Sequence, residues 1–198
     1  MKYFEDPSDK RIWQGISVFP GRSFPDPEDP GFLSSLAAAR ELANQAQTKT
    51  DLLLIGYQIT LKARNLFSLG VDRIFIYDDP KLELFNPSHY LAVFKDYVDN
   101  YHPCAVMLPT SPMEAKFIHQ AADLIQRPIM EHCQKITVLL NGDLTPENCQ
   151  IYGNAHTPAE ITELRPQLFS CEIDSTSPDR MAYPSLGELI LCGTSEIL

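Results

Sequence analysis

The segment CAVMLPTSPMEAKFIHQAADLIQ, residues 104–126, decides the fold. An apolar run ends at Pro109, two hydroxyl residues follow, and a helical pattern begins directly behind them. Strand, hydroxyl-bearing turn and helix is the arrangement in which open α/β sheets hold phosphate groups. The segment therefore has two interpretations: a turn that binds a nucleotide, or a turn that only caps its helix.

The same alternation of apolar runs and helical patterns extends toward the N-terminus. Thr60 is expected to cap the second helix, and Gly70 to end it. Four strands, each followed by a helix or a loop, predict an α/β fold: a three-layer, Rossmann-like parallel sheet with helices on both faces. The expected strands lie within residues 11–19, 51–57, 71–79 and 103–109, and the expected helices within residues 32–47, 61–70, 87–101 and 111–126.

After Pro128 the pattern changes to strand-like segments separated by turns, at residues 134–143, 147–154 and 167–174. They predict a β-rich C-terminal extension that pads or widens the sheet. We therefore expect one α/β domain over residues 1–174 and a tail over residues 175–198. Within the tail, GELILCG is a candidate for one added strand.

Composition excludes several classes of function. The chain has 16 basic and 26 acidic residues and a net charge of −10, so we expect no nucleic acid partner and no binding to anionic membranes. No stretch approaches the roughly 20 apolar residues of a membrane span, so no membrane insertion is expected. The five cysteines are odd in number and widely separated, which favours a reducing, cytoplasmic location over a disulfide framework.

The turn before the last predicted helix is the main candidate site. Thr110 or Ser111 is positioned as an N-cap, Pro112 as the first helical residue, and Ser111 and Glu114 have the spacing of a capping box. A carboxylate at Glu114 would also repel an incoming phosphate. A plain cap is therefore favoured, and a ligand or partner contact at Thr110 and Ser111 is the alternative.

Other motifs carry little chemistry. Neither GxGxxG nor GxxxxGK[ST] is present, and the histidines lack metal-ligand spacing. Asp78 and Asp79 precede Pro80 at a predicted strand end, where turn formation is favoured over cation binding. No pattern supplies a nucleophile, its base and an oxyanion site together. We therefore expect no catalytic residues, no metal site and no enzyme activity.

Four segments stand in an order that matches a known family. They are LGVDRIFIYDDP (69–80), YHPCAVMLPTSPMEAKFI (101–118), IYGNAHTPAEI (151–161) and RPQLFSCEID (165–174). In this order they resemble the N-terminal domain of the electron-transfer flavoprotein α subunit. The resemblance implies a sheet of the adenine nucleotide α hydrolase-like type, in agreement with the alternating pattern.

The resemblance also has departures. The glycine and arginine of the family's TSTGRD text fall on Met113 and Glu114, so only Thr110 and Ser111 carry over as cofactor-binding candidates. The family's α subunit continues into a C-terminal FAD domain, for which the stretch after Arg165 is too short. The resemblance therefore implies a free-standing or truncated relative that lacks this domain.

The function implied by the resemblance is a scaffold or partner-binding module in an electron-transfer system. No intrinsic cofactor is expected, and FAD or AMP would be reached only through a partner subunit. The expected partner is a β-subunit-like protein or a second copy in a homodimer, with residues 151–161 and 165–174 as candidates for the pairing face. The alternative is a small AMP- or ATP-binding module of the same fold.

Overall fold

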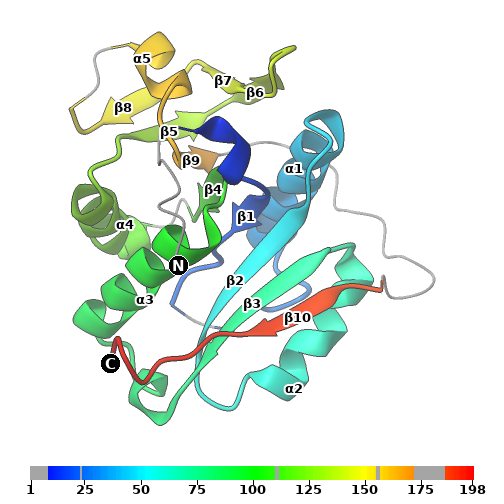
Figure 1. The fold of residues 1–198 in the computed structure, drawn as a ribbon, viewed down its shortest axis with the longest axis vertical. Coiled ribbons are helices and arrows are strands. Elements are labelled where there is room, and N and C mark those ends of the chain that lie inside the picture. The colour runs from blue at the N-terminus through cyan, green and yellow to red at the C-terminus, as the bar shows by residue number, and fades with distance from the viewer. Residues whose placement is uncertain (1–8, 23, 110–111, 155–156, 172–185) are drawn as a thin grey trace.

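The computed structural model describes residues 9–22, 24–109, 112–154, 157–171 and 186–198. Its main sheet has the strand order β10-β3-β2-β1-β4-β9-β5-β8, and only β5 and β8 pair antiparallel (Figure 1). The strands are β1 Ile16–Val18, β2 Thr50–Gly56, β3 Arg73–Asp78, β4 Ala105–Leu108, β5 Ile129–Cys133, β8 Gln150–Tyr152, β9 Gln167–Cys171 and β10 Glu188–Leu191. A separate antiparallel hairpin is formed by β6 Lys135–Val138 and β7 Leu144–Glu147.

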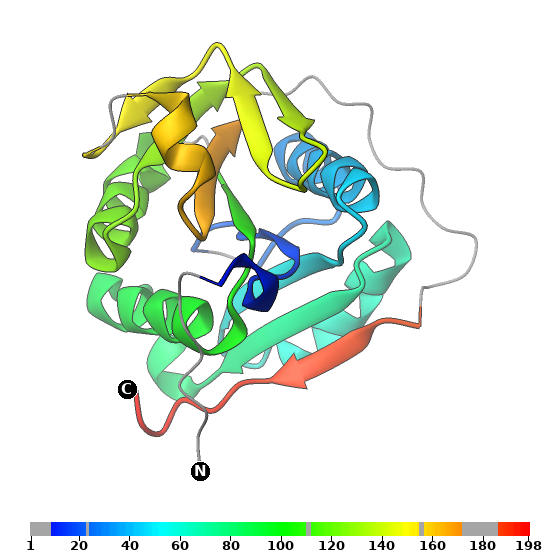
Figure 2. The same cartoon turned by 45° about the horizontal axis from the view of Figure 1, so that its top comes forward.

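Helices cover both faces of the main sheet. Figure 2 shows α3 and α4 together on one side, with α1 and α2 on the other. Neighbouring strand residues face opposite cores: Leu52 packs in the core beneath α1, and Leu53 in the core beneath α3 and α4. The helices are α1 Pro30–Gln45, α2 Thr60–Ala63, α3 Pro87–Tyr101, α4 Pro112–Ile125 and α5 Pro158–Thr162, with short 3₁₀ turns at Lys10–Ile12, Arg64–Leu69 and Pro80–Leu82. The predicted three-layer α/β fold is confirmed.

The long helices begin where local sequence dictates. Asp29 accepts a hydrogen bond from the Phe32 amide and caps α1, and Asn86 accepts one from the Ser88 amide and caps α3. In both helices a proline follows the cap, at the position where its missing N–H leaves no hydrogen bond unmade.

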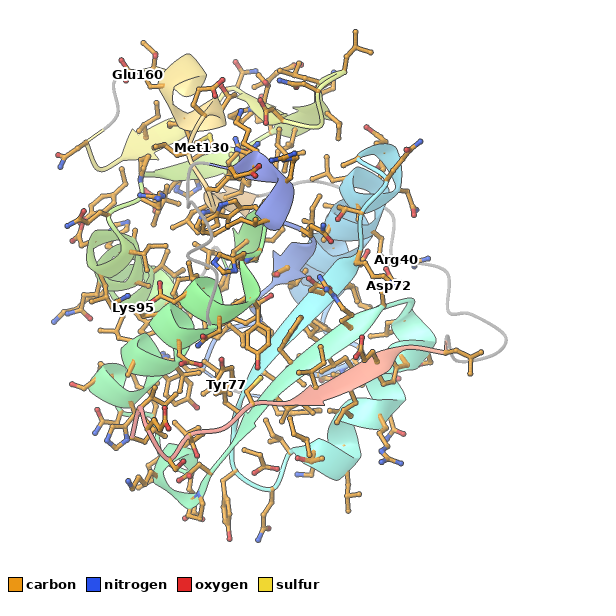
Figure 3. The ribbon with its side chains drawn as sticks, in the orientation of Figure 1. Arg40, Asp72, Tyr77, Lys95, Met130 and Glu160 are labelled. Atoms are coloured by element: carbon orange, nitrogen blue, oxygen red, sulfur yellow. The ribbon has the colours of Figure 1, made fainter. Side chains whose placement is uncertain are left out.

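A hydrogen bond also joins α3 to the sheet beneath it. The Tyr77 hydroxyl of β3 donates to the Asp96 carboxylate of α3 at 2.7 Å (Figure 3).

The predicted cap role of Thr60 is wrong. Thr60 is already the first residue of α2, and the preceding Ile59 makes no side-chain cap. Asp78, at the end of β3, does the capping instead: its carboxylate accepts the amides of Gln58, Ile59 and Thr60 and the Thr60 hydroxyl, at 2.6–3.1 Å. Burial alone would raise the pKa of Asp78, but these hydrogen bonds outweigh burial and lower it. Gly70 ends the following 3₁₀ turn with φ +80°, as expected.

The C-terminal half departs most from the expectation. The segment 167–174 was predicted to belong to an extension, but β9 lies inside the main sheet, between β4 and β5. Strands β5 and β7 were not predicted. β5 has Glu131 and His132 at its centre and a register shift against β9, with His132 at φ +54°, so its sequence lacks a regular strand pattern.

Within the expected tail, Glu188–Leu191 forms β10, which pairs in parallel with β3 at the edge of the main sheet. The candidate strand in GELILCG is thus present, while the domain boundary at residue 174 stays a prediction. In the part of the chain that the structure describes, no helix combines the length and apolar character needed to span a membrane.

Candidate functional site

The carboxyl ends of β1 and β4 border the crevice that open α/β sheets use for ligands. From β1 the chain runs through α1 to β2 on one side, whereas β4 is reached from β3 through α3 on the other. The strand order therefore reverses between β1 and β4, which makes this pair the topological switch point of the sheet. The loop after β1 and the first turn of α4 face each other there.

The two predicted binding residues, Thr110 and Ser111, lie outside the described residues. Pro112 begins α4, as predicted from the sequence. The choice between cap and ligand contact at Thr110 and Ser111 therefore stays a prediction, and the described neighbours define the rest of the crevice.

An ion pair spans the crevice. The Arg22 Nε donates to Glu114 Oε1 at 2.8 Å, which joins the loop after β1 to the first turn of α4. The two side chains are only 23% and 13% exposed. Gly21 has φ +105°, and a Cβ at this position would lie 3.3 Å from the Glu114 carboxylate, so glycine permits both the backbone conformation and the close approach.

Aromatic side chains pack next to Arg22 of this ion pair. The Arg22 guanidinium carbon lies 4.6 Å from the centre of the Phe85 ring, within cation–π distance. Phe85, Tyr90 and Phe117 pack edge to face, with centroids 4.9–6.4 Å apart. The Tyr90 hydroxyl donates to the Arg22 carbonyl at 3.2 Å. Burial raises the pKa of Tyr90, and the nearby charge of Glu114 adds to the effect.

The charges in this crevice oppose the binding of a phosphate. Glu114 places a carboxylate at the helix terminus whose partial positive charge would otherwise attract an anion. The same carboxylate engages Arg22, and its second oxygen, Oε2, is buried without a hydrogen-bond partner among the described residues. The described residues therefore do not fit the pyrophosphate of FAD, since it would meet a negative charge at close range.

Asp78 and Asp79 are turn formers, as predicted. Asp78 caps α2 from the end of β3, and Asp79 caps the next 3₁₀ turn by accepting the Lys81 amide at 2.8 Å. Asp79 also accepts the Thr194 hydroxyl at 2.7 Å and so ties the segment after β10 to the end of β3. Within the described ranges, no group of three or more acidic, histidine or cysteine residues could hold a metal ion.

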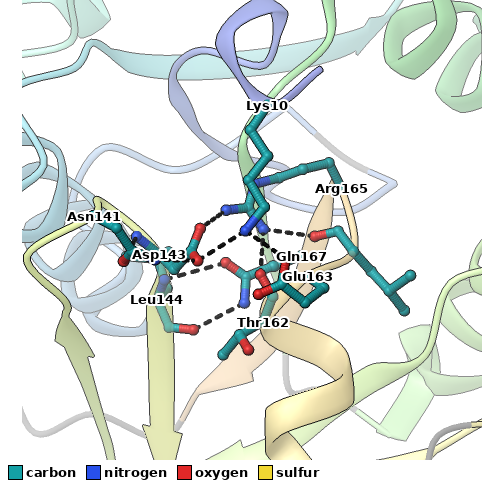
Figure 4. Close-up of polar contacts among 9 residues, drawn as sticks. Lys10, Asn141, Asp143, Leu144, Thr162, Glu163, Arg165 and Gln167 are labelled. Atoms are coloured by element: carbon teal, nitrogen blue, oxygen red, sulfur yellow. Dashed lines mark hydrogen bonds and ion pairs between the residues drawn. The ribbon is translucent and has the colours of Figure 1, made fainter. Parts of the chain in front are cut away.

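A second polar cluster, at the opposite end of the sheet, was not predicted (Figure 4). Arg165 forms a close, buried ion pair with Asp143, and Lys10 bonds to both Asp143 and Glu163 at 2.9 Å. The Gln167 side chain accepts a hydrogen bond from the Leu144 amide at 3.3 Å and donates one to the Leu144 carbonyl at 2.8 Å. We call Lys10, Asp143, Glu163, Arg165 and Gln167 the basal network.

The basal network joins segments that are far apart in the sequence. It connects the N-terminal 3₁₀ turn, the β6–β7 hairpin, the end of α5 and the start of β9. Burial alone would raise the pKa of Asp143, but the hydrogen bond from Lys10 and the charge of Arg165 hold it below its ordinary value. No local pattern indicates such a cluster. The one available signal was that Arg165 opens the family-like segment RPQLFSCEID.

The expected pairing face needs correction. The segment 165–174 was proposed as part of an exposed apolar surface, but residues 165–170 are buried, since β9 is an interior strand, and residues 172–174 lie outside the described residues. In the other expected segment, Ile161 is buried, and Ile151 and Tyr152 are half-buried. The fully exposed large apolar side chains of the described chain are elsewhere, chiefly Leu140 and Leu186.

Comparison with known proteins gives a consistent result. Residues 29–186 match the family described as "Electron transfer flavoprotein domain". The subunit LctC of lactate dehydrogenase (NAD(+),ferredoxin) from Acetobacterium woodii is 26% identical over 177 residues, which cover 89% of this chain and 42% of that protein. Electron transfer flavoprotein subunit alpha from Thermoanaerobacterium thermosaccharolyticum is 21% identical over 133 residues, 67% of this chain and 40% of that protein. The corresponding subunit from Megasphaera elsdenii is 24% identical over 103 residues, 52% of this chain and 30% of that protein. The chain thus spans less than half the length of these relatives.

Proposed function

The chain belongs to the electron transfer flavoprotein domain family, and from that premise we propose that it is an α-subunit-like scaffold or partner-binding module in an electron-transfer system. The similarity to two electron transfer flavoprotein α subunits and to LctC supports this role. In this proposal the chain itself is not an enzyme. A cytoplasmic location remains a prediction from cysteine usage.

The Arg22–Glu114 ion pair is the observation that carries the proposal. Open α/β folds bind ligands at the switch point, here between β1 and β4, yet the Arg22 guanidinium described there is already paired with the Glu114 carboxylate. In a nucleotide-binding site, the arginine side chain and the amino end of the helix would instead be free to bind a phosphate group. The crevice residues are thus better suited to hold the β1 loop against α4 than to bind a cofactor.

We therefore propose that the chain holds no FAD of its own. This proposal is supported by the described residues at the switch point, which do not fit a pyrophosphate because Glu114 is placed there and is already paired with Arg22. In this proposal flavin or AMP is bound by a partner subunit. The partner is a flavoprotein β-subunit-like protein, in preference to a second copy, because two chains of net charge −10 repel each other.

The test is co-expression of this chain with the flavoprotein β subunit of the same organism. We expect the two proteins to elute together in size-exclusion chromatography, with flavin absorbance in the complex and none in this chain alone. A co-expressed β subunit that elutes separately, at concentrations well above micromolar, would contradict the proposal.

A nucleotide-binding module of the same fold, holding AMP or ATP, is the second candidate. One observation favours it: Arg22 brings a guanidinium to the switch point, and this group binds phosphate well. To bind there, a nucleotide would have to displace Glu114 from Arg22.

A further inference from the structure

Two cysteines from separate elements meet where β5, β7 and β8 come together (Figure 1). Cys133 is the last residue of β5, and Cys149 lies in the short connection between β7 and β8. Cys133 is fully buried in the core beneath α1, and the half-buried Cys149 packs against the same core. The fold therefore places two thiols in one corner of the protein.

Hydrogen bonds hold the two cysteine-bearing segments side by side. β5 and β8 pair antiparallel directly ahead of Cys133. Directly behind it, the Gln134 amide donates to the Glu147 carbonyl at 3.3 Å, and the Asn148 side-chain amide donates to Gln134 Oε1 at 3.0 Å. Cys149 follows Asn148, so its backbone is fixed next to that of Cys133.

The two side chains also contact each other. The thiols of Cys133 and Cys149 are within hydrogen-bonding distance. The Cys133 thiol in addition donates to the Met130 carbonyl at 3.2 Å, which orients its side chain. Two cysteines in contact across neighbouring segments can be joined by a disulfide without a large movement of the backbone.

Exposure distinguishes the roles of the two thiols. Burial raises the pKa of the Cys149 thiol, and the adjoining Cys133 adds to the effect, so Cys149 is a slow nucleophile at neutral pH. Its partial exposure still allows contact with a small molecule, whereas Cys133 is closed to solvent. Cys149 is thus the thiol that meets an external oxidant first.

We propose that Cys133 and Cys149 form a disulfide when the protein meets a small-molecule disulfide oxidant such as oxidised glutathione. The Cys149 thiolate attacks one sulfur of the oxidant, breaks its S–S bond and releases a glutathione thiolate, which takes up the proton that Cys149 has lost. The Cys133 sulfur then attacks the Cys149 sulfur and releases the second glutathione, which leaves with the Cys133 proton. Two cysteine thiols are oxidised, and one oxidised glutathione is reduced to two thiols.

The disulfide would close a loop that contains the β6–β7 hairpin and Asp143 of the basal network (Figure 4). Such a bond restricts the unfolded chain, so oxidation stabilises the folded protein. For a loop of this length we expect the melting temperature to rise by about 5–10 °C. In a reducing compartment both thiols stay reduced, so the bond forms as a response to oxidising conditions.

The experiment is incubation of the intact chain with excess oxidised glutathione at mildly alkaline pH, followed by peptide mapping with mass spectrometry. We expect a crosslink between Cys133 and Cys149. Cys149→Ser should abolish it, and Cys133→Ala should stop at one glutathione bound to Cys149. The matched control is Cys192→Ser, because Cys192 is also half-buried but follows β10 at the opposite edge of the main sheet. This variant should form the crosslink as the wild type does.

Other outcomes overturn the proposal. Wild-type protein that carries glutathione on Cys149 without a crosslink, or whose two thiols stay reduced, would refute it. A crosslink from Cys133 to Cys171, its register partner on β9, would refute the choice of Cys149. Melting curves of the reduced and oxidised protein test the consequence. An unchanged melting temperature in the crosslinked protein would refute the stabilising role, and Cys149→Ser should show no shift on oxidation.

Discussion

The two ends of the main sheet each carry an arginine–carboxylate pair, and the two pairs differ in burial and in the number of hydrogen-bond partners. At the amino end, Arg165 and Asp143 are 5% and 3% exposed, and Lys10 provides a further hydrogen bond to Asp143. At the carboxyl end, Arg22 and Glu114 are 23% and 13% exposed, and one oxygen of Glu114 lacks a partner among the described residues.

The difference in burial and in hydrogen-bond partners indicates that the two ion pairs have different roles. The amino-end pair joins four segments of the chain, so its loss should affect the whole fold. The carboxyl-end pair lies where open α/β folds bind ligands, and it links only one loop to one helix. We interpret it as a contact that holds the loop after β1 against α4.

The largest expected effect is from Arg165→Met. This substitution removes the buried counterion of Asp143 and leaves only the more exposed Lys10 beside it, so we expect the free energy of unfolding to fall by about 3–5 kcal/mol. Urea unfolding followed by circular dichroism measures the loss. Arg11→Met is the control, because the Arg11–Asp9 pair is exposed to solvent and its loss should change the free energy of unfolding little. Equal losses in the two variants would show that the basal network does not support the fold.

The Arg165–Asp143 pair also predicts that the free energy of unfolding depends on pH. The pKa of Asp143 is lower in the folded protein than in the unfolded chain, so its ionisation stabilises the fold at neutral pH. This stabilisation is complete above the unfolded pKa of about 4 and is lost as pH falls through the folded pKa. Asp143→Asn should therefore be less stable than wild type at pH 7, and the difference should shrink in acid. A difference that does not change with pH would contradict this account.

A smaller effect is expected from Arg22→Met. The pair with Glu114 is partly exposed, so we expect a loss of about 1–2 kcal/mol, well below that of Arg165→Met. Urea unfolding again gives the value. A loss as large as that of Arg165→Met would remove the distinction between the two ends of the sheet.

The smallest expected effect is on the affinity for AMP and ATP. The wild type should show no micromolar affinity for AMP or ATP in calorimetric titration, because Glu114 faces the position of a phosphate. Glu114→Arg should give weak binding, since it removes the repulsion and adds a phosphate ligand. Glu41→Arg, the same charge change on an exposed face of α1, is the control and should give none. Micromolar binding by the wild type would favour the nucleotide-binding candidate.

Sequence periodicity was sufficient for the N-terminal part of the fold. β2, β3 and β4 are apolar runs, and α3 was predicted with its observed bounds because Pro87 and an amphipathic repeat define it locally. The cap of α2 was not predictable in this way, since Asp78 reaches Thr60 from the next strand. Such a contact depends on the sheet having already formed.

The same dependence on contacts between distant segments explains why the ion pairs of the candidate site were not predicted. Arg22 and Glu114 are 92 positions apart, and Arg165 and Asp143 are 22 apart on different elements. Sequence spacing predicts a local capping box for Glu114, which stays a prediction, and it gives no sign of the contact between the Glu114 carboxylate and the loop after β1. β5 was missed because its central residues are polar and its register against β9 is irregular.

The most direct test of the central claim is the flavin and nucleotide content of the isolated chain. The protein is purified without a partner, its absorbance is recorded in the flavin bands, and a denatured extract is analysed for FAD and AMP. A scaffold whose crevice is closed by Arg22 and Glu114 predicts no stoichiometric flavin and no nucleotide. About one FAD or one AMP per chain after gel filtration would contradict it, because either ligand requires a phosphate site that the described crevice does not offer.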